Sequence, residues 1–393
     1  MKPFSIDKSS ILLILILVIV AALAAGLFVS LRSDAADQAL KGDRILNVLV
    51  ILEVDRRPQS TELFMLYPAT GKGALLDVPA ETGLIIKSLN RVDRIDALYD
   101  TRRPHAYVDE IARLLAANVP YWIILDAQGL ADAADLLDGL ELFVPDAIAD
   151  QGPPVVRLPS GALTLDGDKV LQYASWHNPD DGEADRAGRR QKVVQSFLKR
   201  IGQKSAWLGR SDTFSAFRRC LRTNLSDSAL RRFIEDLGRI DADRLLMQRV
   251  TGIYRNVDDK QLLFPHYDGE LVRDIVKQTL NALSNSVAGG AADKIYTIEV
   301  LNGTPSKGIA KKTAEIFQSF GYDVVSVGNA DRDDYDRSIV LDRMSNPDAL
   351  KNVASVIRCA NVADQPAVNG QNTADFTVIL GNDFNGRYCA QQP

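Results

Sequence analysis

The stretch "ILNVLVILEVDRRPQSTELFMLYPATGKGALLDVP", from Ile45 to Pro79, decides the architecture of the chain. Its apolar runs over 45–54, 61–68 and 73–79 are rich in Val, Ile and Leu, which is typical of buried strands. The letters "ATGK" between the last two runs form a turn suited to a hairpin. The stretch therefore predicts three consecutive strands around which the following segments are arranged.

Helical and strand patterns alternate after these strands. Residues 106–119 carry apolar side chains at helical spacing, 121–126 return as a strand, and 185–203 form a basic helix with an apolar stripe. This alternation predicts an α/β sandwich with a mixed central sheet over residues 44–283.

A second, smaller domain is expected after the glycine-rich linker "SNSVAGGAAD" (284–293). We expect strands and helices in the order 295–301, 306–319, 323–328, 337–342, 347–358 and 374–380. The β-α-β-β-α-β order predicts a ferredoxin-like α+β domain over 294–385, followed by a tail over 386–393.

The N-terminal region predicts a membrane anchor. Residues 11–31 contain no charge and have about the length that crosses a bilayer, and Lys2 and Lys8 precede them. We expect a cytoplasmic tail (1–10), a single transmembrane helix (11–31), a stalk (32–43) and extracytoplasmic globular domains. The small residues of "AALAAG" leave cleavage as a signal peptide as the alternative.

Composition excludes several classes of function. A net charge of −5 argues against a general nucleic-acid binder. Three cysteines and three histidines without metal-ligand spacing argue against a zinc or haem centre. Cys359 and Cys389 fall in one terminal region, where they either pair in an oxidising compartment or remain two buried thiols.

The segment "EVLNGTPSKGIAKK" (299–312) has the strand, glycine loop and helix order of phosphate cradles. The spacing of a Walker motif is absent. We interpret the loop as a tight turn in which Gly303 allows unusual backbone angles and Thr304 or Ser306 caps the helix.

Both globular blocks resemble known families. "IEVLNGTPSKGIAKKTAEIFQSFGYDVVSVGNADRDDYDRSIVLDR" and "FTVILGNDF" resemble the LytR C-terminal domain. "NVLVILEVDRR", "LLDVPAETG", "RIDALY", "NVPYWIILDAQGLADAADLLDGLEL" and "GDKVLQYASWHNPDDGEADRAGRRQKVVQSFL" resemble, in order, the motifs of a divergent LytR-CpsA-Psr (LCP) catalytic domain.

The LCP resemblance implies a transferase of the cell envelope. Such a protein takes a glycopolymer from a polyprenyl-pyrophosphate carrier and attaches it to peptidoglycan, often with Mg²⁺. The phosphoanhydride carries the energy of the reaction, and the leaving phosphate must be stabilised by arginines and by a metal held by carboxylates. The implied partners are the polyprenyl-phosphate-linked glycan, peptidoglycan and the membrane.

Matching the family's motifs residue by residue gives a candidate site. The candidate catalytic residues are Asp55, Arg56 and Glu81, with Asp55 also as the metal ligand. The candidate ligand-binding residues are Arg57, Arg94, Asp96, Arg186, Arg189, Arg190 and Gln191, although the arginines of the basic helix also fit a solvated helix face.

Two departures from the family pattern decide the functional prediction. Ala80 and Ser175 stand where the family has arginines that stabilise the leaving phosphate. We therefore expect binding of a polyprenyl-(pyro)phosphate-linked glycan with weak or lost phosphotransferase activity. The alternatives are an active transferase with rearranged residues, or a structural or recruiting envelope protein without a lipid ligand. A long apolar tunnel beside the Asp55–Arg56 region would mark a transferase or binder, whereas a structural protein would fill that space with side chains.

Overall fold

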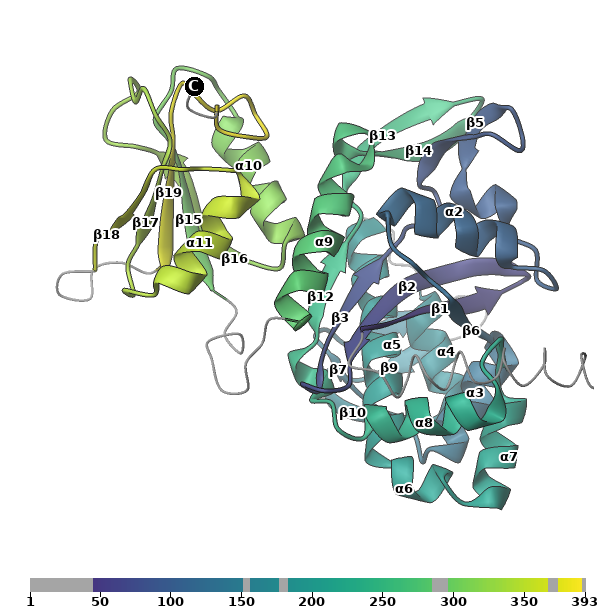
Figure 1. Ribbon diagram of the computed structural model, residues 1–393. Helices are drawn as coiled ribbons and strands as arrows, with labels where there is room; N and C mark the ends of the chain where they lie inside the picture. Colours follow the sequence, from purple (N-terminus) through teal and green to yellow (C-terminus); the bar gives the residue numbers. More distant parts are fainter. Residues whose placement is uncertain (1–44, 151–155, 177–182, 285–295, 367–373, 391–393) are drawn as a thin grey trace, which may run out of the picture.

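The computed structural model describes residues 45–150, 156–176, 183–284, 296–366 and 374–390. A six-stranded sheet in the order β11-β6-β1-β2-β3-β12 organises the larger domain (Figure 1). Its strands are β1 (Leu46–Val54), β2 (Arg57–Tyr67), β3 (Lys72–Asp77), β6 (Tyr121–Asp126), β11 (Arg222–Thr223) and β12 (Leu246–Arg249). Strands β1, β3, β6 and β12 run parallel to one another, while β2 and β11 run against them. The predicted mixed sheet is confirmed.

Helices cover both faces of this sheet. One face carries α2 (His105–Leu115) and α9 (Glu270–Ser284). The other carries α3 (Ala127–Leu136), α4 (Gly167–Ser175), α5 (Glu183–Gln203), α6 (Ser205–Leu208), α7 (Ser211–Arg219) and α8 (Asp227–Leu237). Each strand contributes side chains to both faces of the sheet, because successive side chains alternate. In β1, Leu49 belongs to the core between the sheet and α2 and α9 (the α2–α9 core), and Val48 belongs to the core on the opposite face (the α5 core).

Short elements complete the larger domain. The small hairpins are β4 (Gly83–Ile86) with β5 (Arg91–Arg94), β7 (Leu140–Val144) with β10 (Gly161–Leu165), β8 (Ile148–Asp150) with β9 (Val156–Leu158), and β13 (Gly252–Val257) with β14 (Lys260–Pro265). The 3-10 helices are η1 (Ile95–Leu98), η2 (Ala242–Arg244) and η3 (His266–Gly269).

The smaller domain has a five-stranded sheet in the order β16-β15-β19-β17-β18. Its elements are β15 (Thr297–Asn302), α10 (Ile309–Ser319), β16 (Asp323–Asn329), β17 (Ile339–Asp342), α11 (Pro347–Val356), β18 (Val362–Asp364) and β19 (Phe376–Leu380). The predicted order of strands and helices is observed, with the short β18 added.

The sheet order of this domain is not that of a ferredoxin-like fold. In a split β-α-β arrangement another strand separates the two parallel strands that the helix connects. Here α10 returns the chain directly beside its starting strand, so β15 and β16 are parallel neighbours. The expected ferredoxin-like topology is therefore corrected to an adjacent β-α-β unit extended by β19, β17 and β18.

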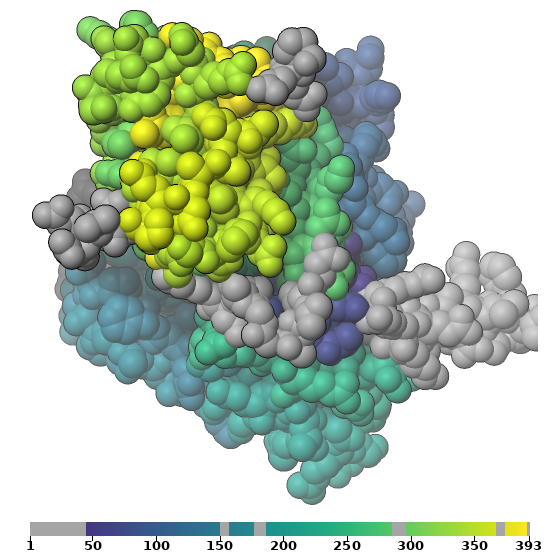
Figure 2. Space-filling view, turned by 60° about the vertical axis from the view of Figure 1, so that its left-hand side comes forward, coloured from purple at the N-terminus to yellow at the C-terminus, as the bar shows by residue number. Residues whose placement is uncertain are grey.

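Helix α9 joins the two domains. Its apolar residues, among them Leu271 and Ile275, belong to a core that continues into the smaller domain, where it includes Phe317 and Val353. Figure 2 shows the yellow-green smaller domain resting directly on the green segment of the larger one. The predicted linker begins where α9 ends, at Ser284, and its other residues lie outside the described part.

Within the described residues, no helix combines the length and apolar character needed to span a membrane. The expected transmembrane helix (11–31), its cytoplasmic tail and its stalk (32–43) lie outside those residues.

Candidate functional site

Two buried carboxyl groups face each other where β2 and β3 pair. Glu62 and Asp77 are directly opposite residues of this antiparallel pair, and their side chains are 0% and 2% exposed. Their neighbours Phe64 and Leu75 belong to the α5 core, which places both carboxyl groups on the α5 face of the sheet. Asp77 ends β3, so the pair lies at the edge where parallel strands end and α/β proteins bind ligands.

Helix α5 brings the first polar partners to this pair. The side-chain amide of Gln191 donates to Oε2 of Glu62 at 3.0 Å and to the carbonyl oxygen of Gln248 at 3.0 Å. Arg190 is 9% exposed, and its charge acts on Asp77. The apolar stripe of α5 docks the helix on the sheet, and this docking buries Arg190 and Gln191 at the strand ends.

Strand β12 supplies a second arginine. Nε of Arg249 donates to Oδ2 of Asp77 at 2.9 Å, and the hydroxyl of Ser60 donates to Oε1 of Glu62 at 3.1 Å. We call Ser60, Glu62, Asp77, Arg190, Gln191 and Arg249 the edge cluster. It contains two carboxyl groups and two guanidinium groups, and both arginines act on Asp77.

Burial governs the titration of the two carboxyl groups. It raises the pKa of Glu62 well above its usual value, and the negative charge of Asp77 raises that pKa further. Burial also raises the pKa of Asp77, although the charges of Arg249 and Arg190 oppose this effect. The edge cluster therefore favours the protonated form of Glu62, which removes the repulsion between the two facing groups.

The space next to the edge cluster on the same face is apolar and nearly filled. Its lining comes from β1, β6, α5, α7, α8 and the residue that precedes β11, and consists of Val50, Ile123, Phe197, Leu198, Ile201, Phe217, Leu221, Leu230, Phe233 and Ile234. The rings of Phe197 and Phe217 stack with centroids 6.3 Å apart. A cavity of about 10 Å³ remains, which is the room of about one water molecule. Side chains thus fill this apolar space in the structure.

An open groove of about 500 Å³ lies on the other flank of α5. The hairpin β7–β10, η2 and α5 line it with Glu141, Leu142, Phe143, Ala162, Leu163, Thr164, Lys192, Gln195, Ser196, Lys199 and Asp243. Phe143 is 61% exposed, and Lys199 forms an ion pair with Asp243 at 2.7 Å. An exposed aromatic ring beside polar donors and acceptors is a lining suited to a polar ligand.

Two of the predicted catalytic residues, Asp55 and Arg56, lie apart from the edge cluster, whereas the charge of Glu81 acts on Asp77 and raises its pKa. Asp55 and Arg56 form the exposed turn between β1 and β2, with φ of 51° and 62°, the left-handed values of a tight mirror-image hairpin turn. Arg57, the first residue of β2, is exposed as well. The carboxylate of Glu81 accepts a hydrogen bond from the Tyr254 hydroxyl at 3.0 Å.

The predicted ligand-binding residues divide into two groups. Arg190 and Gln191 are in the edge cluster, so the interpretation as a solvated helix face is wrong for Arg190. Arg94 instead binds Asp96 with two hydrogen bonds, of 3.0 and 2.7 Å. Arg189 lies over the ring of Trp176 at 4.8 Å and donates to its carbonyl oxygen, and Arg186 is half-buried on the first turn of α5 that the structure describes.

Sequence reasoning missed Glu62, Asp77 and Arg249. The signal was an acid inside the apolar run "TELFML" and another at the end of "GALLD", since a charge within a buried strand is rarely placed without a partner. A third buried carboxyl group was also missed: on the opposite face of the sheet, Glu53 accepts hydrogen bonds from Tyr99, Thr101 and Arg222.

The described residues offer Mg²⁺ a poor fit. No group of three or more acidic, histidine or cysteine side chains gathers among them. Asp55 is on an exposed turn, and the carboxyl oxygens of Glu62 and Asp77 already accept from Ser60, Gln191 and Arg249. We therefore derive no reaction step through a metal.

The loop after β15 satisfies its own polar groups. Oδ1 of Asn302 accepts from the backbone N–H and the hydroxyl of Thr304, and Nδ2 donates to the carbonyl oxygen of Ser306. The expected helix caps are wrong: α10 begins after Gly308, and no side chain caps it. The left-handed residue is also Gly308, with φ of 79°, rather than Gly303.

Close packing explains Gly303. A Cβ atom there would lie 2.6 Å from the Tyr335 ring and 2.7 Å from the Leu380 carbonyl oxygen. Gly303 also donates to the carbonyl oxygen of Leu380 at 2.9 Å and accepts from the N–H of Tyr335 at 2.9 Å. The loop is a packed connection between β15, α10 and β19.

Comparison with known proteins gives matches for both domains. Residues 46–281 match the LytR_cpsA_psr family, and residues 295–384 match the family described as LytR cell envelope-related transcriptional attenuator.

Curated relatives include the polyisoprenyl-teichoic acid–peptidoglycan teichoic acid transferase TagU of Bacillus cereus, 22% identical over 175 residues, which are 44% of this chain and 57% of the relative. TagU of Bacillus licheniformis is 23% identical over 160 residues, 40% of this chain and 51% of the relative. The chain thus spans about half the length of the curated relatives that it matches.

Among solved structures, TagV of B. subtilis superposes with a TM-score of 0.54 at 16% identity, over 61% of this chain and 98% of TagV. A structure of TagT bound to LI-WTA gives a TM-score of 0.52 at 16% identity, over 61% of this chain and 91% of TagT. These similarities show a shared fold.

Proposed function

This chain belongs to the LytR-CpsA-Psr family, and from that premise we propose that it binds a polyprenyl-(pyro)phosphate-linked glycan of the cell envelope and transfers it slowly or not at all. The proposal places the chain at the cell membrane, with its globular domains outside and peptidoglycan as a partner. It is supported by relatives whose names describe transfer of teichoic acid from a polyisoprenyl carrier to peptidoglycan.

The observation that carries this proposal is that α5 presents polar side chains first and apolar side chains further along the same face. At its first turns, Arg190 and Gln191 reach the edge cluster, and two turns later Phe197, Leu198 and Ile201 line the apolar space on the same face. A phosphate with an apolar chain has the same two parts in the same order. The head group would lie at the strand ends, and the chain would enter between the sheet and α5, α7 and α8.

The balance of charge argues for slow turnover. Arg249 and Arg190 already act on Asp77, so part of their positive charge is compensated before a leaving phosphate could use it. The two family arginines are replaced by Ala80, which follows Pro79 in the loop after β3, and by the exposed Ser175 at the end of α4. Rate requires contacts that strengthen in the transition state, whereas binding uses contacts present throughout.

A titration of the full chain with a short-chain polyprenyl phosphate tests the proposal. We expect measurable binding that Arg190→Ala weakens about tenfold or more, as expected for loss of a charge-assisted contact. The matched control is Lys192→Ala, the exposed cation two residues along the same helix, which should leave affinity unchanged. An equal loss of affinity in both variants would mean that the ligand is bound by nonspecific attraction to positive charge.

The apolar half of the ligand is tested separately. Phe217→Ala removes a ring from the filled space, so it should tighten binding of the polyprenyl phosphate if the chain enters there. Phosphate release with Mg²⁺, measured in parallel, should be very slow and should rise in the double variant Ala80→Arg, Ser175→Arg. Rapid release by the unmodified chain would exclude a degenerate site.

A second candidate function, a recruiting envelope protein without a lipid ligand, is favoured by the contrast between the two cavities. The apolar space of about 10 Å³ must open before a lipid enters, whereas the groove beside Phe143 and Lys192 already has about 500 Å³. The test is sedimentation of the chain with lipid-free peptidoglycan. Two results together would support this second function: sedimentation that is lost in Phe143→Ala, and no binding of polyprenyl phosphate by the unmodified chain.

A further inference from the structure

The two cysteines of the smaller domain lie against each other. Cys359 follows α11 by three residues, and Cys389 lies near the end of the described chain. The backbone N–H of Cys389 donates to the carbonyl oxygen of Ile357 at 2.8 Å, which brings the second thiol beside the first. Both side chains are buried, neither is in a disulfide bond, and each thiol shifts the pKa of the other, as expected for neighbouring sulfur atoms.

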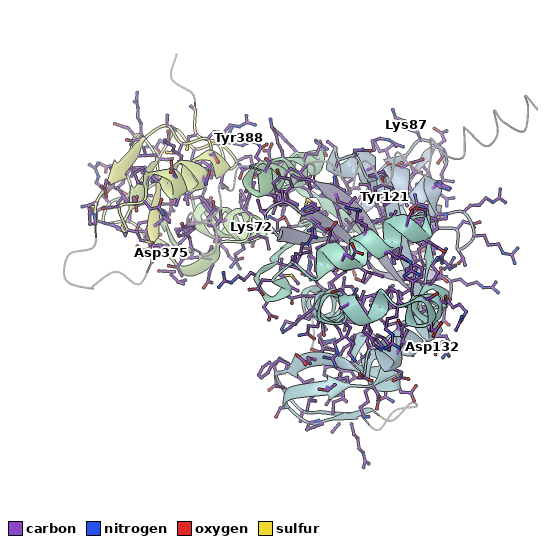
Figure 3. The ribbon with its side chains drawn as sticks, turned by 60° about the horizontal axis from the view of Figure 1, so that its bottom comes forward. Lys72, Lys87, Tyr121, Asp132, Asp375 and Tyr388 are labelled. Atoms are coloured by element: carbon purple, nitrogen blue, oxygen red, sulfur yellow. The ribbon has the colours of Figure 1, made fainter. Side chains whose placement is uncertain are left out.

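The segment that carries Cys389 also holds the two domains together. Arg387 is 3% exposed and donates to Oδ2 of Asp274 on α9 at 2.9 Å and to the carbonyl oxygen of Val356 at 2.6 Å. The hydroxyl of Tyr388 donates to Asp274 and to Glu270. Tyr388 is labelled in Figure 3, on the side of the smaller domain that faces the larger one.

Further contacts extend the same seam. The hydroxyl of Tyr267, in η3 of the larger domain, donates to the carbonyl oxygen of Gly386 at 2.6 Å. Three consecutive residues, 386–388, thus contact the larger domain, and Cys389 comes next. We call residues 385–390 the clasp.

We propose that Cys359 and Cys389 become joined by a disulfide bond in the cell envelope, and that this bond fastens the clasp and with it the docking of the smaller domain on α9. The inference rests on the extracytoplasmic location in the proposed function, because disulfides persist in oxidising compartments. It assigns the cysteine pair a covalent role and makes the domain interface sensitive to redox state.

The chemistry balances through an external disulfide, such as oxidised glutathione or the oxidised dithiol of an envelope oxidase. One thiolate attacks the external disulfide and displaces a thiolate from it, and the second cysteine then attacks the mixed disulfide and displaces the other external thiolate. Two S–H bonds are lost and one S–S bond forms, two protons pass to solvent, and the external disulfide takes up two electrons. The neighbouring Cys389 thiol lowers the pKa of Cys359, which suits Cys359 to the first attack.

Thiol counting on the full chain tests whether the bond forms. Treatment with oxidised glutathione followed by alkylation under denaturing conditions should leave one reactive thiol, Cys220, out of three. Trypsin cleaves after Arg358 and Arg387, so mass spectrometry should find residues 359–387 linked to 388–393 until a reductant is added. Three alkylated cysteines, or a link to Cys220, would overturn the proposal.

Two further measurements test whether the disulfide bond stabilises the smaller domain and whether it strengthens the docking on α9. The oxidised chain should unfold its smaller domain about 10 °C higher than the reduced chain, and hydrogen exchange of α9 should slow at least about tenfold. Cys220→Ala should keep both differences, and Cys389→Ser should abolish them. Equal exchange of α9 in the two redox states would exclude a fastening role.

Alkylation of thiols in acid-quenched cells separates the failure of this inference from that of the proposed location. A bond that forms in purified protein but is absent from cells would overturn the native disulfide and the extracytoplasmic location together. A bond that fails to form in purified protein would overturn the disulfide alone. Protection of both cysteines in cells, with Cys220 alkylated, would support both.

Discussion

The edge cluster and the loop after β15 are two places where polar residues bond one another, yet they are built differently. In the edge cluster, the bonds that matter join residues distant in sequence, such as Gln191 with Glu62, 129 residues apart, and Arg249 with Asp77, 172 apart. In the loop, Asn302, Thr304 and Ser306 bond one another within four residues. A glycine-rich local motif marked a packed connection, whereas the charged site was assembled from four separate strands and helices.

The comparison predicts that single changes in the edge cluster are costly because they leave charges buried. Arg249→Ala removes the donor to Asp77, and we expect the larger domain to lose about 3 kcal/mol of unfolding free energy. Asp77→Asn in the same chain should recover part of the loss. Urea unfolding followed by tryptophan fluorescence reports this domain, since Trp122, Trp176 and Trp207 all lie in it.

Arg244→Ala is the control for this change. Arg244 pairs with Asp241, and both side chains are more than half exposed, so the cost should stay below about 1 kcal/mol. Similar costs for the two arginine variants would remove the distinction between a buried cluster and surface charge.

The stability of the smaller domain should be sensitive to larger side chains at the glycines of the loop after β15. Gly303→Ala places a methyl group 2.7 Å from the Leu380 carbonyl oxygen, which belongs to the backbone and cannot turn away, so we expect a loss of about 2 kcal/mol in the smaller domain. Gly308→Ala, which meets no atom within 4 Å but needs a left-handed backbone, should cost about 1 kcal/mol. Hydrogen exchange of the β15 and β19 amides measures both, and the reverse order of costs would contradict the packing explanation.

A smaller, pH-dependent effect is expected at Glu62. Because burial raises its pKa in the folded chain, the folded state binds the proton more tightly than the unfolded state, and stability falls as pH rises from the unfolded toward the folded pKa. Glu62→Gln removes this dependence and keeps an amide oxygen for Gln191. The variant should match the unmodified chain near pH 4 and exceed it by about 1 kcal/mol near pH 8.

Urea unfolding at a series of pH values measures the effect at Glu62, with the exposed Glu141→Gln as control. A difference that does not change between pH 4 and pH 8 would show that Glu62 titrates normally.

The smallest effect is expected for anions at the loop. Inorganic pyrophosphate should leave hydrogen exchange of residues 302–309 unchanged within error, because the loop's side-chain donors and acceptors are used internally. Ser306→Ala should therefore not alter any response of the chain to pyrophosphate. Protection of these amides by the anion would restore the phosphate-cradle interpretation.

The sequence predicted the strands and helices better than the site. Apolar periodicity located β1, β2, β3, α2, β6 and α5, and the strand and helix order of the smaller domain, because these features are local. Sheet order in that domain depends on which strands pair at a distance, and the ferredoxin-like expectation failed there. Motif matching found Arg190 and Gln191 but not Glu62, Asp77 and Arg249, whose role appears only when β2, β3, β12 and α5 meet.

The two facing carboxyl groups have a consequence for how any phosphate would be held. A phosphate that approached Arg190 and Arg249 would add negative charge next to Glu62 and Asp77, whose repulsion already favours a bound proton. Binding would therefore draw further protons from solvent, and affinity would fall as pH rises. Proton uptake and phosphate binding at the edge cluster would then be coupled, so that each strengthens the other.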